Sequence, residues 1–522
     1  MSDRTDDDIR KQVKDRVTQE AAALPSSRGE PEITRQFVRD CLFLNEEGDS
    51  ILYATLFRDR FVYLKNRQEW FEWRAHVWKR DVMNRAAAAV SRIAEIYLNE
   101  SKKVALDIVD LMAGEQRNAE AILKLKGRQK DLLKRHSQLR ADKRRTACLK
   151  FAHNIDNPLA ITGDEFDDKP MLFPCANGVI DLETGTLNPG RPRDYLSLSS
   201  PVAFLDINTP APLWEKTLLE IFNGNQDLVD YLQRLFGYAM TGLIGEKVFP
   251  ILYGRTGWNG RSLIVETISY VMGELARSIP SEMLLSQKFA NSSGPSPDIM
   301  SLKGIRMAFA SEIDENQRFS AARVKWFTGK DELVGRSPHD KYPTYFSPTH
   351  KLIIMTNTQP TAPPNDSAFW LRLHLIPFFI SFVNRDPQES HERRAILDLD
   401  KQVLTEAPGI LSWLVRGCLL WQKHGLKPPR EVTSATEEYR KNEDLLADWI
   451  DECCIREPGA KEKATNLYQS FIQWYHDNVG KKEPSGTWFG KQLAQKYEKS
   501  KSQGVIIYHG IALKDYRGEG DS

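Results

Sequence analysis

The feature that most constrains this chain is a glycine-rich turn between an apolar strand and an amphipathic helix. The stretch VFPILYGRTGWNGRSLIVETISYVMG starts with apolar residues 248–253, passes through the turn and enters a helical pattern at about Ser262. Glycines allow successive backbone N–H groups to converge on an anion, and a helix N-terminus adds partial positive charge. This context predicts a phosphate-binding loop within a sheet whose strands alternate with helices.

The loop departs in two ways from the common pattern G-x-x-x-x-G-K-[ST]. Five residues rather than four separate Gly254 from Gly260, and Arg261 stands where the pattern has lysine. Ser262 remains as the hydroxyl for Mg²⁺. Because the planar fork of arginine is not a compact ammonium, the departures leave open an active ATPase, nucleotide binding without turnover, and a simple glycine-rich turn.

Four polar signals follow the loop in the order that a nucleotide hydrolase needs. The apolar run GIRMAFASEID leads to Glu312, a candidate for orienting water and helping to hold Mg²⁺. The run HKLIIMTNTQP ends at Asn357, whose amide would contact the terminal phosphate or the attacking water. Between them, two short strands are expected around the polar tip 337–341. Arg372, in PPNDSAFWLRLHLIPF, is suited to project from a subunit edge and stabilise transition-state charge in trans.

Charge is unevenly distributed along the chain. The net charge of +1 argues against a polycationic coat for nucleic acid. Residues 115–150 are expected to be helical, and from 117 to 150 they carry twelve basic and three acidic residues. Residues 461–517 carry ten basic and five acidic residues. These stretches are either solvated faces or DNA contacts.

Aromatic residues gather near the N-terminus, with Trp70, Trp73 and Trp78 in EWFEWRAHVWKRD. The first interpretation is a small sheet-containing core with buried aromatics over about 33–78. The second is a platform on which bases stack.

Composition excludes several other classes of protein. The 41% hydrophobic content argues against disorder, and no apolar run approaches the ~20 residues of a membrane span. The six cysteines form neither a CxxC pair nor a Cys/His pattern, so no zinc site or disulfide framework is expected. The polar N-terminus is unlike a secretory signal, and a reducing cytoplasm is the expected compartment.

Several further segments carry a family resemblance. They are FPCANGVIDLETGTLNPGRPRDYLSLSSPVAF, YLQRLFGYAMTG, NGRS, GIRMAFASE, FTGKDELVGR, KLIIMTN and FWLRLHLIPF. In them the chain resembles the phage- and plasmid-encoded primase-helicases of the poxvirus type, in helicase superfamily 3 of the AAA+ ATPases. The resemblance covers roughly residues 35–515 and is strongest over 170–450.

The resemblance implies a helicase that forms a hexameric ring, binds ATP and Mg²⁺ between subunits, and threads single-stranded or forked DNA, with 3′→5′ translocation. The implied phosphate-loop residues are Gly254, Gly257, Trp258, Asn259, Gly260, Arg261 and Ser262, with Ser262 and Glu312 at the metal. The implied catalytic residues are Glu312, Asn357 as sensor, and Arg372 as arginine finger. The implied DNA contacts on the 337–341 hairpin and beside it are Lys330, Arg336, His339 and Lys341.

The expected fold is α/β, with a superfamily 3 AAA+ parallel-sheet core, a mainly helical N-terminal region and a small C-terminal winged-helix-like domain. The expected divisions are a helical region with an aromatic-rich sheet (1–160), a collar (161–212), the ATPase core (213–385), a helical region packing on it (386–454) and the winged-helix-like domain (455–522). Residues 1–160 hold no D-x-D or D-x-E catalytic set followed by a His motif, so no polymerase domain is expected.

Two functions compete with the helicase. One is a DNA-binding ring with weak or absent ATPase, which Arg261 would mark. The other is an AAA+ remodeller of a replication or defence complex. The resemblance favours a phage or another mobile element in the cytoplasm of a bacterial host, a separate primase or other replication proteins as partners, and no membrane.

Overall fold

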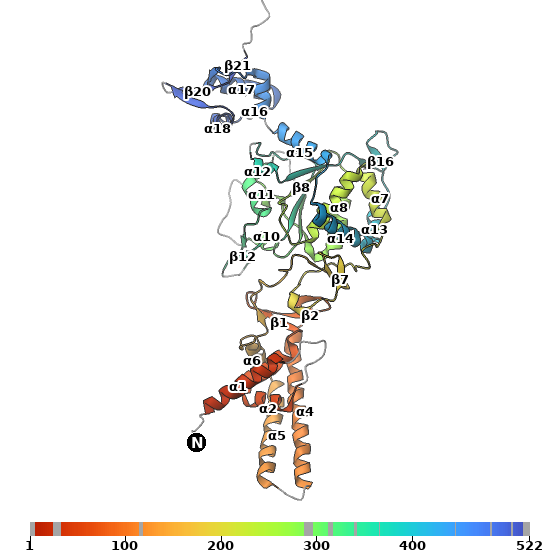
Figure 1. The fold of residues 1–522 in the computed structure, drawn as a ribbon, viewed down its shortest axis with the longest axis vertical. Helices are drawn as coiled ribbons and strands as arrows, with labels where there is room; N and C mark the ends of the chain where they lie inside the picture. Colours follow the sequence, from red (N-terminus) through yellow and green to blue (C-terminus); the bar gives the residue numbers. More distant parts are fainter. Residues whose placement is uncertain are drawn as a thin grey trace, which may run out of the picture.

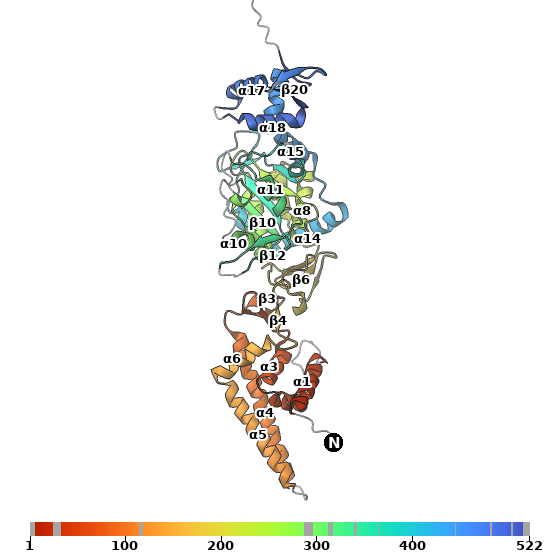
Figure 2. The same cartoon turned by 90° about the vertical axis from the view of Figure 1, so that its left-hand side faces the viewer.

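The computed structural model describes residues 6–23, 33–113, 118–286, 296–311, 317–338, 342–364, 366–443, 445–480, 483–502 and 505–514. Figures 1 and 2 show an elongated molecule, in which N-terminal helices, a central sheet and a C-terminal unit follow one another along the long axis. The fold is mixed α/β with a parallel sheet and many helices, which confirms the coarse fold class expected from the sequence.

The N-terminal region is mainly helical and is organised around one buried carboxylate. Asp49 is fully buried and accepts hydrogen bonds from Arg135 at 2.7 Å, Arg144 at 2.8 Å and Tyr97 at 2.9 Å. Such charge-assisted bonds fix geometry as well as charge, so this cluster holds four helices at one point. The helices of the region are α1 (Asp6–Ala23), α2 (Arg35–Phe43), α3 (Asn45–Phe57), α4 (Arg85–Ala113), α5 (Ala119–Leu139) and α6 (Asp142–Ala152).

The tryptophan-rich segment forms a four-stranded sheet in the order β3-β2-β1-β4. Trp78 is buried, donates from Nε1 to the Pro192 carbonyl at 2.8 Å, and meets Trp73 edge-on at 5.5 Å. The buried-core interpretation is therefore confirmed for Trp78, although residues 35–57 of the same stretch are helical. The strands are β1 (Phe61–Leu64), β2 (Glu69–Arg74), β3 (Val77–Arg80) and β4 (Ala160–Ile161).

The turn-rich segment after the N-terminal helices forms a small antiparallel sheet, as its composition predicts. Its elements are β5 (Leu172–Cys175), β6 (Gly178–Asp181), β7 (Thr186–Asn188) and the 3-10 helix η1 (Pro192–Asp194). Lys79 donates to the Ser197 carbonyl at 2.9 Å and also binds Glu274, directly after the helix that follows the glycine-rich turn. The segment therefore connects the N-terminal sheet to the central one.

The central sheet is fully parallel and has the strand order β14-β8-β13-β10-β9. Apart from the edge strand β9, its strands are short and mainly apolar, as expected for strands covered on both faces. Numbered within the sheet, the order is 5-1-4-3-2. The strands are β8 (Phe249–Tyr253), β9 (Ala276–Ser278), β10 (Met307–Ser311), β13 (Lys351–Thr356) and β14 (Leu373–Pro377).

Helices before and after the sheet in sequence pack on it. Two of them, α8 (Gln226–Met240) and α14 (Ala407–His424), approach closely at glycines: a Cβ on Gly237 would lie 2.1 Å from the backbone N of Cys418. Only glycine allows this backbone contact. The other helical segments are α7 (Pro212–Ile221), α9 (Arg261–Met272), η2 (Gly273–Leu275), η3 (Ser281–Met283), α10 (Pro297–Met300), α11 (Ala321–Phe327), α12 (Ser367–Trp370), α13 (Leu399–Leu404) and α15 (Arg430–Asn442).

Residues 333–394 also contain two strand pairs that are not part of the central sheet. Antiparallel β11 (Leu333–Gly335) and β12 (Thr344–Phe346) form the expected hairpin, and β15 (Ser381–Val383) pairs with β16 (Glu392–Arg394). The β15 pair lies beside the glycine-rich turn, because the Phe382 backbone N donates to the Trp258 carbonyl at 2.7 Å.

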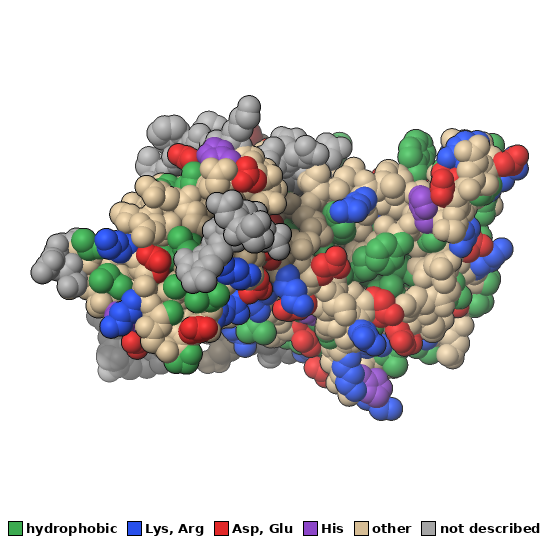
Figure 3. Space-filling model, turned by 90° about the horizontal axis from the view of Figure 1, so that it is seen from above, with side chains coloured by type: hydrophobic (Ala, Val, Ile, Leu, Met, Phe, Trp, Pro, Cys, Tyr) green, Lys and Arg blue, Asp and Glu red, His purple; other side chains and the backbone are tan. Residues whose placement is uncertain are grey.

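The C-terminal unit combines three helices with short strands around Trp449, Phe471 and Phe489. One sheet has the order β18-β20-β19, and β17 pairs with β21. Seen from this end of the molecule, basic and acidic side chains are interspersed with separate hydrophobic patches (Figure 3). The elements are α16 (Leu445–Cys453), β17 (Cys454–Ile455), β18 (Lys461–Lys463), α17 (Ala464–Asn478), α18 (Gly486–Lys496), β19 (Lys499–Ser502), β20 (Val505–His509) and β21 (Ala512–Leu513).

None of the helices in the described part of the chain combines the length and apolar character needed to cross a membrane.

Candidate functional site

The predicted phosphate loop lies at the carboxyl edge of the parallel sheet. It links β8 to α9, and β13 runs beside β8 in parallel, with Thr356 opposite Tyr253. Because parallel strands end at the same edge, the loop and the carboxyl ends of β10 and β13 lie at one edge of the sheet. This is where ligands bind in open α/β sheets.

The loop requires glycine at two of its three glycine positions. A Cβ on Gly254 would lie 2.0 Å from the Asn259 side-chain nitrogen, and one on Gly260 would lie 2.6 Å from Ile221. Gly260 also has φ +83° as the N-cap of α9, a conformation that glycine adopts without strain. Space is open around Gly257. These features fit a backbone cradle for phosphate at the helix N-terminus.

Arg261 is buried and points its guanidinium toward the strand ends. Its Nε donates to the Asn259 oxygen at 2.8 Å, and its terminal nitrogens donate to the Thr356 carbonyl and to the Asn357 side-chain oxygen. A longer bond of 3.4 Å reaches the Leu252 carbonyl. Burial lowers the pKa of Arg261 from its ordinary value. The residue in the lysine position therefore joins the loop, β8 and β13.

Side chains within the loop also hold it in place. The Asn259 amide donates to the Thr256 carbonyl at 2.7 Å, and the Thr256 hydroxyl lies 2.6 Å from that of Ser381 in β15. Trp258, by contrast, is 79% exposed and has φ +59°. The loop therefore has a rigid base and presents a large aromatic ring to solvent.

The structure describes only some of the residues predicted to bind metal or to act in catalysis. Ser262 is exposed in the first turn of α9, where a hydroxyl could ligate Mg²⁺ alongside bound phosphates. β10 ends at Ser311, and Glu312 lies outside the described residues. Within the described ranges, no cluster of three or more His, Cys, Asp or Glu side chains is arranged to hold a metal ion.

Arg372 lies at the opposite edge of the sheet from the phosphate loop. It precedes β14, an outer strand, and Leu373 pairs with Phe249 at the start of β8. At ~3.3 Å per residue, the length of β8 separates it from its own loop by about 16 Å. Its guanidinium donates to the Ala368 carbonyl at 2.6 Å. The fold thus separates Arg372 from the loop in the same chain.

The predicted DNA-contacting residues belong to the β11–β12 hairpin and the turn before it. Lys330 is exposed, and Arg336 is half-buried, with its backbone N–H and carbonyl bonded to Ser296. His339 and Lys341 lie outside the described residues. The structure therefore places Lys330 and Arg336 but not His339 and Lys341.

In the basic stretch 115–150, the described residues from 118 onward form two helices, because α5 ends at Leu139 and α6 starts at Asp142. Antiparallel α4 and α5 extend away from the remainder of the molecule (Figures 1 and 2). Arg135 and Arg144 serve the Asp49 cluster, so part of the positive charge is structural. Exposed basic side chains remain at Lys124, Lys126, Lys130, Lys134, Arg140, Lys143 and Lys150.

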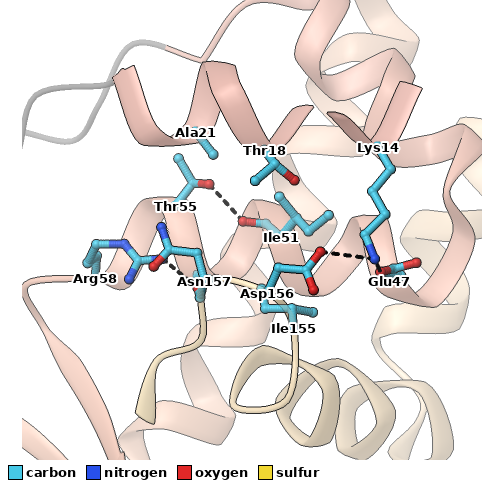
Figure 4. Close-up of a pocket in the computed structure, with 11 residues that line it drawn as sticks. Lys14, Thr18, Ala21, Glu47, Ile51, Thr55, Arg58, Ile155, Asp156 and Asn157 are labelled. Atoms are coloured by element: carbon cyan, nitrogen blue, oxygen red, sulfur yellow. Dashed lines mark hydrogen bonds and ion pairs between the residues drawn. The ribbon is translucent and has the colours of Figure 1, made fainter. Parts of the chain in front are cut away.

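A small pocket in the N-terminal region, open to solvent on one side, is unrelated to the phosphate loop. It has about 20 Å³, room for a single water molecule. Figure 4 shows Lys14 bonded to Glu47 and Asp156, and Arg58 reaching Asn157. Its charged lining is paired internally, which favours a structural role.

Sequence reasoning missed the contacts that fix the loop from elsewhere. Ser381 and the Thr356 carbonyl hold Thr256 and Arg261, yet Ser381 is 125 residues from Thr256 in the chain. No local motif marks either residue. The pairing of Arg261 with Asn357 was also not expected, because each residue was assigned a separate phosphate contact.

The chain is similar to proteins of large DNA viruses. A family model described as "D5 N terminal like" matches residues 51–223. "Putative helicase L207/L206" of Acanthamoeba polyphaga mimivirus is 29% identical over 332 residues, covering 61% of this chain and 34% of that protein. "Putative helicase 022R" of Frog virus 3 is 23% identical over 395 residues, covering 62% and 40%.

A third relative is "Putative primase C962R" of African swine fever virus, which is 22% identical over 353 residues, covering 64% of this chain and 36% of that protein. The chain thus spans roughly 34–40% of the length of these relatives. Among solved structures, the apo NrS-1 C terminal region (305–718) matches with a TM-score of 0.37 and 12% identity, covering 60% of this chain and 79% of that one.

Proposed function

We propose that this relative of the poxvirus-type D5 helicases and primases is the motor part of an ATP-dependent DNA helicase that acts as a ring. The observation that carries the proposal is the sheet: five parallel strands in the order 5-1-4-3-2, with the glycine-rich loop on strand 1. This is the arrangement expected of the AAA+ core to which the motifs point. The relatives named as helicases and primases support the same class of protein.

The residues at the carboxyl edge supply the parts needed to bind and cleave a nucleoside triphosphate. The backbone from Gly254 to Gly260 and the N-terminus of α9 would hold the phosphates, with Arg261 as the cation. Ser262 would ligate Mg²⁺, which neutralises charge on the triphosphate when bound. Glu312 would orient the attacking water, and Asn357 would act as the sensor.

Arg372 would complete the site of a neighbouring copy. Its place at the far edge of the sheet, about 16 Å from its own loop, supports action in trans. A head-to-tail interface of this kind closes into a ring when the rotation permits it. A hexamer is the assembly that we propose.

Several surfaces would contact DNA. The β11–β12 hairpin would present Lys330, Arg336, His339 and Lys341 to one strand in the channel. The C-terminal unit would be a winged-helix-like module, with the antiparallel pair β19–β20 as its wing. This unit and the basic face of α5 and α6 would hold the duplex or the fork. Translocation in the 3′→5′ direction is part of the same proposal.

A nucleotide-binding ring with weak turnover is the second candidate, because one observation favours it. The Arg261 guanidinium already donates to Asn259, Thr356 and Asn357. It must give up some of these acceptors to meet a phosphate. Slow hydrolysis with intact DNA binding would be the consequence.

The test is ATP hydrolysis with and without forked DNA, together with strand displacement, for the native chain and Glu312→Gln. The helicase proposal predicts DNA-stimulated hydrolysis and unwinding that Glu312→Gln abolishes. Glu266→Gln, which makes the same chemical change at an exposed position in α9, serves as the matched control. If the native chain binds DNA and ATP but hydrolyses ATP slowly or not at all, the second candidate replaces the first. Rapid hydrolysis without unwinding would contradict both and favour a remodeller.

A further inference from the structure

Trp258 is the most exposed aromatic side chain of the phosphate loop and has no role in the loop's own packing. It is 79% exposed, whereas its neighbour Asn259 is 3% exposed. The Trp258 carbonyl is held by the Phe382 N–H, so the backbone that carries the ring is fixed. Exposing a tryptophan costs hydrophobic free energy unless a partner covers it. Arg255, three residues earlier in the same loop, is exposed as well.

An open groove of about 320 Å³ lies beside Arg372 at the other edge of the sheet. It runs between α12, β14 and α15, and its apolar wall includes Trp370, Leu373 and Val432. Leu371, next to Arg372, lines it and is 81% exposed. Glu437 also lines the groove and is exposed on α15, beside the exposed Glu438. The other polar lining residues are Ser367, His374, Thr433, Thr436 and Arg440.

The two surfaces are on edges of the sheet that must meet if Arg372 acts in trans. The loop extends from the carboxyl end of β8, and Arg372 precedes the amino end of β14. An arginine that reaches a neighbour's triphosphate brings its flanking residues against that neighbour's phosphate loop. Leu371 and Leu373 flank Arg372 in sequence and line the groove, so the groove would be carried to the same place.

We propose that the phosphate loop of one copy docks in the α12–β14–α15 groove of the next copy. Trp258 packs against the apolar wall, and Arg255 faces Glu437. The occupant is a second copy of this chain because the two surfaces complement each other: an exposed aromatic ring meets an open apolar groove, and the exposed Arg255 meets the exposed Glu437 of its lining. This inference rests on the proposed ring and names the residues that set its interface.

Docking would also link assembly to the nucleotide. The loop that holds the phosphates is the element that enters the neighbour, and its base is tied to Asn357 through Arg261. A ligand that fixes the loop in one conformation would therefore strengthen the contact with the next copy.

Charge exchange on the full-length chain tests the electrostatic part. We expect Arg255→Glu and Glu437→Arg each to reduce the oligomer fraction at least tenfold, as measured by native mass with a non-hydrolysable ATP analogue. In the double variant, the protein concentration at which half of the chains are in oligomers should lie within about threefold of the native value. Circular dichroism checks folding, and Glu438→Arg, one residue along α15, is the control for added positive charge. A double variant no better than the worse single variant would overturn the pairing.

Cross-linking tests the position of the ring. Trp258→Cys and Thr433→Cys are combined, the latter at an exposed groove residue of α15, and disulfides between copies are scored on a denaturing gel. We expect a ladder of cross-linked copies with the analogue, and at least fivefold less product when Thr433→Cys is replaced by Lys423→Cys near the end of α14. Equal or absent ladders would overturn the docking. If Arg372 still supported ATP hydrolysis by a neighbouring copy, the proposed ring would stand and only this interface would be rejected.

Discussion

The guanidinium of Arg261 donates a hydrogen bond to the side-chain oxygen of Asn357, so the first residue of α9 is tied to the residue that follows β13. The two residues were expected to contact the nucleotide separately. In the structure they are hydrogen-bonded to each other, and the Asn259 side-chain oxygen and the Thr356 carbonyl accept further hydrogen bonds from Arg261. A phosphate that draws Arg261 toward the loop must therefore release Asn357, and the two residues respond together.

Replacing Arg261 with lysine should tighten nucleotide binding and lower the stability of the protein without nucleotide. A lysine ammonium lacks the planar fork and cannot hold Asn259, Thr356 and Asn357 at once. Loss of these bonds should cost about 1–3 kcal/mol of stability. It should also raise affinity for an ATP analogue by roughly tenfold, because about 1.4 kcal/mol is no longer needed to break the hydrogen bonds that Arg261 makes within the site. Isothermal titration and thermal unfolding measure both effects.

Arg255→Lys is the control for that change, since Arg255 lies in the same loop and is exposed. It should leave affinity within about twofold of native. Weaker binding by Arg261→Lys than by the native chain would mean that the arginine fork itself holds the phosphates.

Asp49→Asn should destabilise the N-terminal region strongly. Burial raises the pKa of Asp49, and Arg135 and Arg144 oppose that rise. Removing the carboxylate charge leaves Arg135 buried without its counter-ion, at a cost of about 3–5 kcal/mol. Denaturant unfolding followed by near-ultraviolet circular dichroism should show an early transition. Asp110→Asn, on the exposed side of α4, should unfold like the native chain, and equal midpoints for both variants would refute the role of the cluster.

Acid should destabilise the central sheet between about pH 6.5 and pH 4. Burial lowers the pKa of His374, which bonds Tyr231, to about 4. Burial with the charge of Lys351 does the same for His350. Since the unfolded state binds these protons at higher pH, the stabilisation is full above pH 6.5 and is lost as pH falls toward 4. Each histidine should contribute at most about 1.4 kcal/mol per pH unit.

His374→Gln keeps an acceptor for Tyr231 and removes one titration. The drop in melting temperature between pH 7.5 and pH 5 should therefore be smaller than in the native chain. His391→Gln, at an exposed position, should leave the drop unchanged. An unchanged drop in His374→Gln would assign acid lability to other groups.

Sequence patterns predicted the elements whose signals are local. The strand–turn–helix at 248–272, the strand before Glu312, the strand ending at Thr356 and the 333–346 hairpin each follow from apolar runs next to glycine or polar residues. The predicted winged-helix-like domain stays a prediction. The ring assembly also stays a prediction, because it depends on other copies of the chain.

Contacts between residues far apart in the sequence could not be predicted from these local patterns. Nothing near Ser381 marks it as a partner of Thr256, and the burial of Arg261 depends on acceptors from β8 and β13. The basic stretch was expected as one helix, yet it turns at Arg140 and gives Arg135 and Arg144 to Asp49. Composition reports the number of charges in a segment, whereas the fold determines which of them remain available for a partner.

Mixing two inactive variants tests the trans-acting ring most directly. Arg261→Ala should lack a working phosphate loop, and Arg372→Ala should lack the finger, so neither should hydrolyse ATP on forked DNA. In mixed rings of equal proportions, a wild-type loop meets a wild-type finger at about one interface in four, and hydrolysis should recover to roughly a quarter of native. No recovery from rings shown by mass to contain both variants would contradict action in trans, as would full hydrolysis by Arg372→Ala alone.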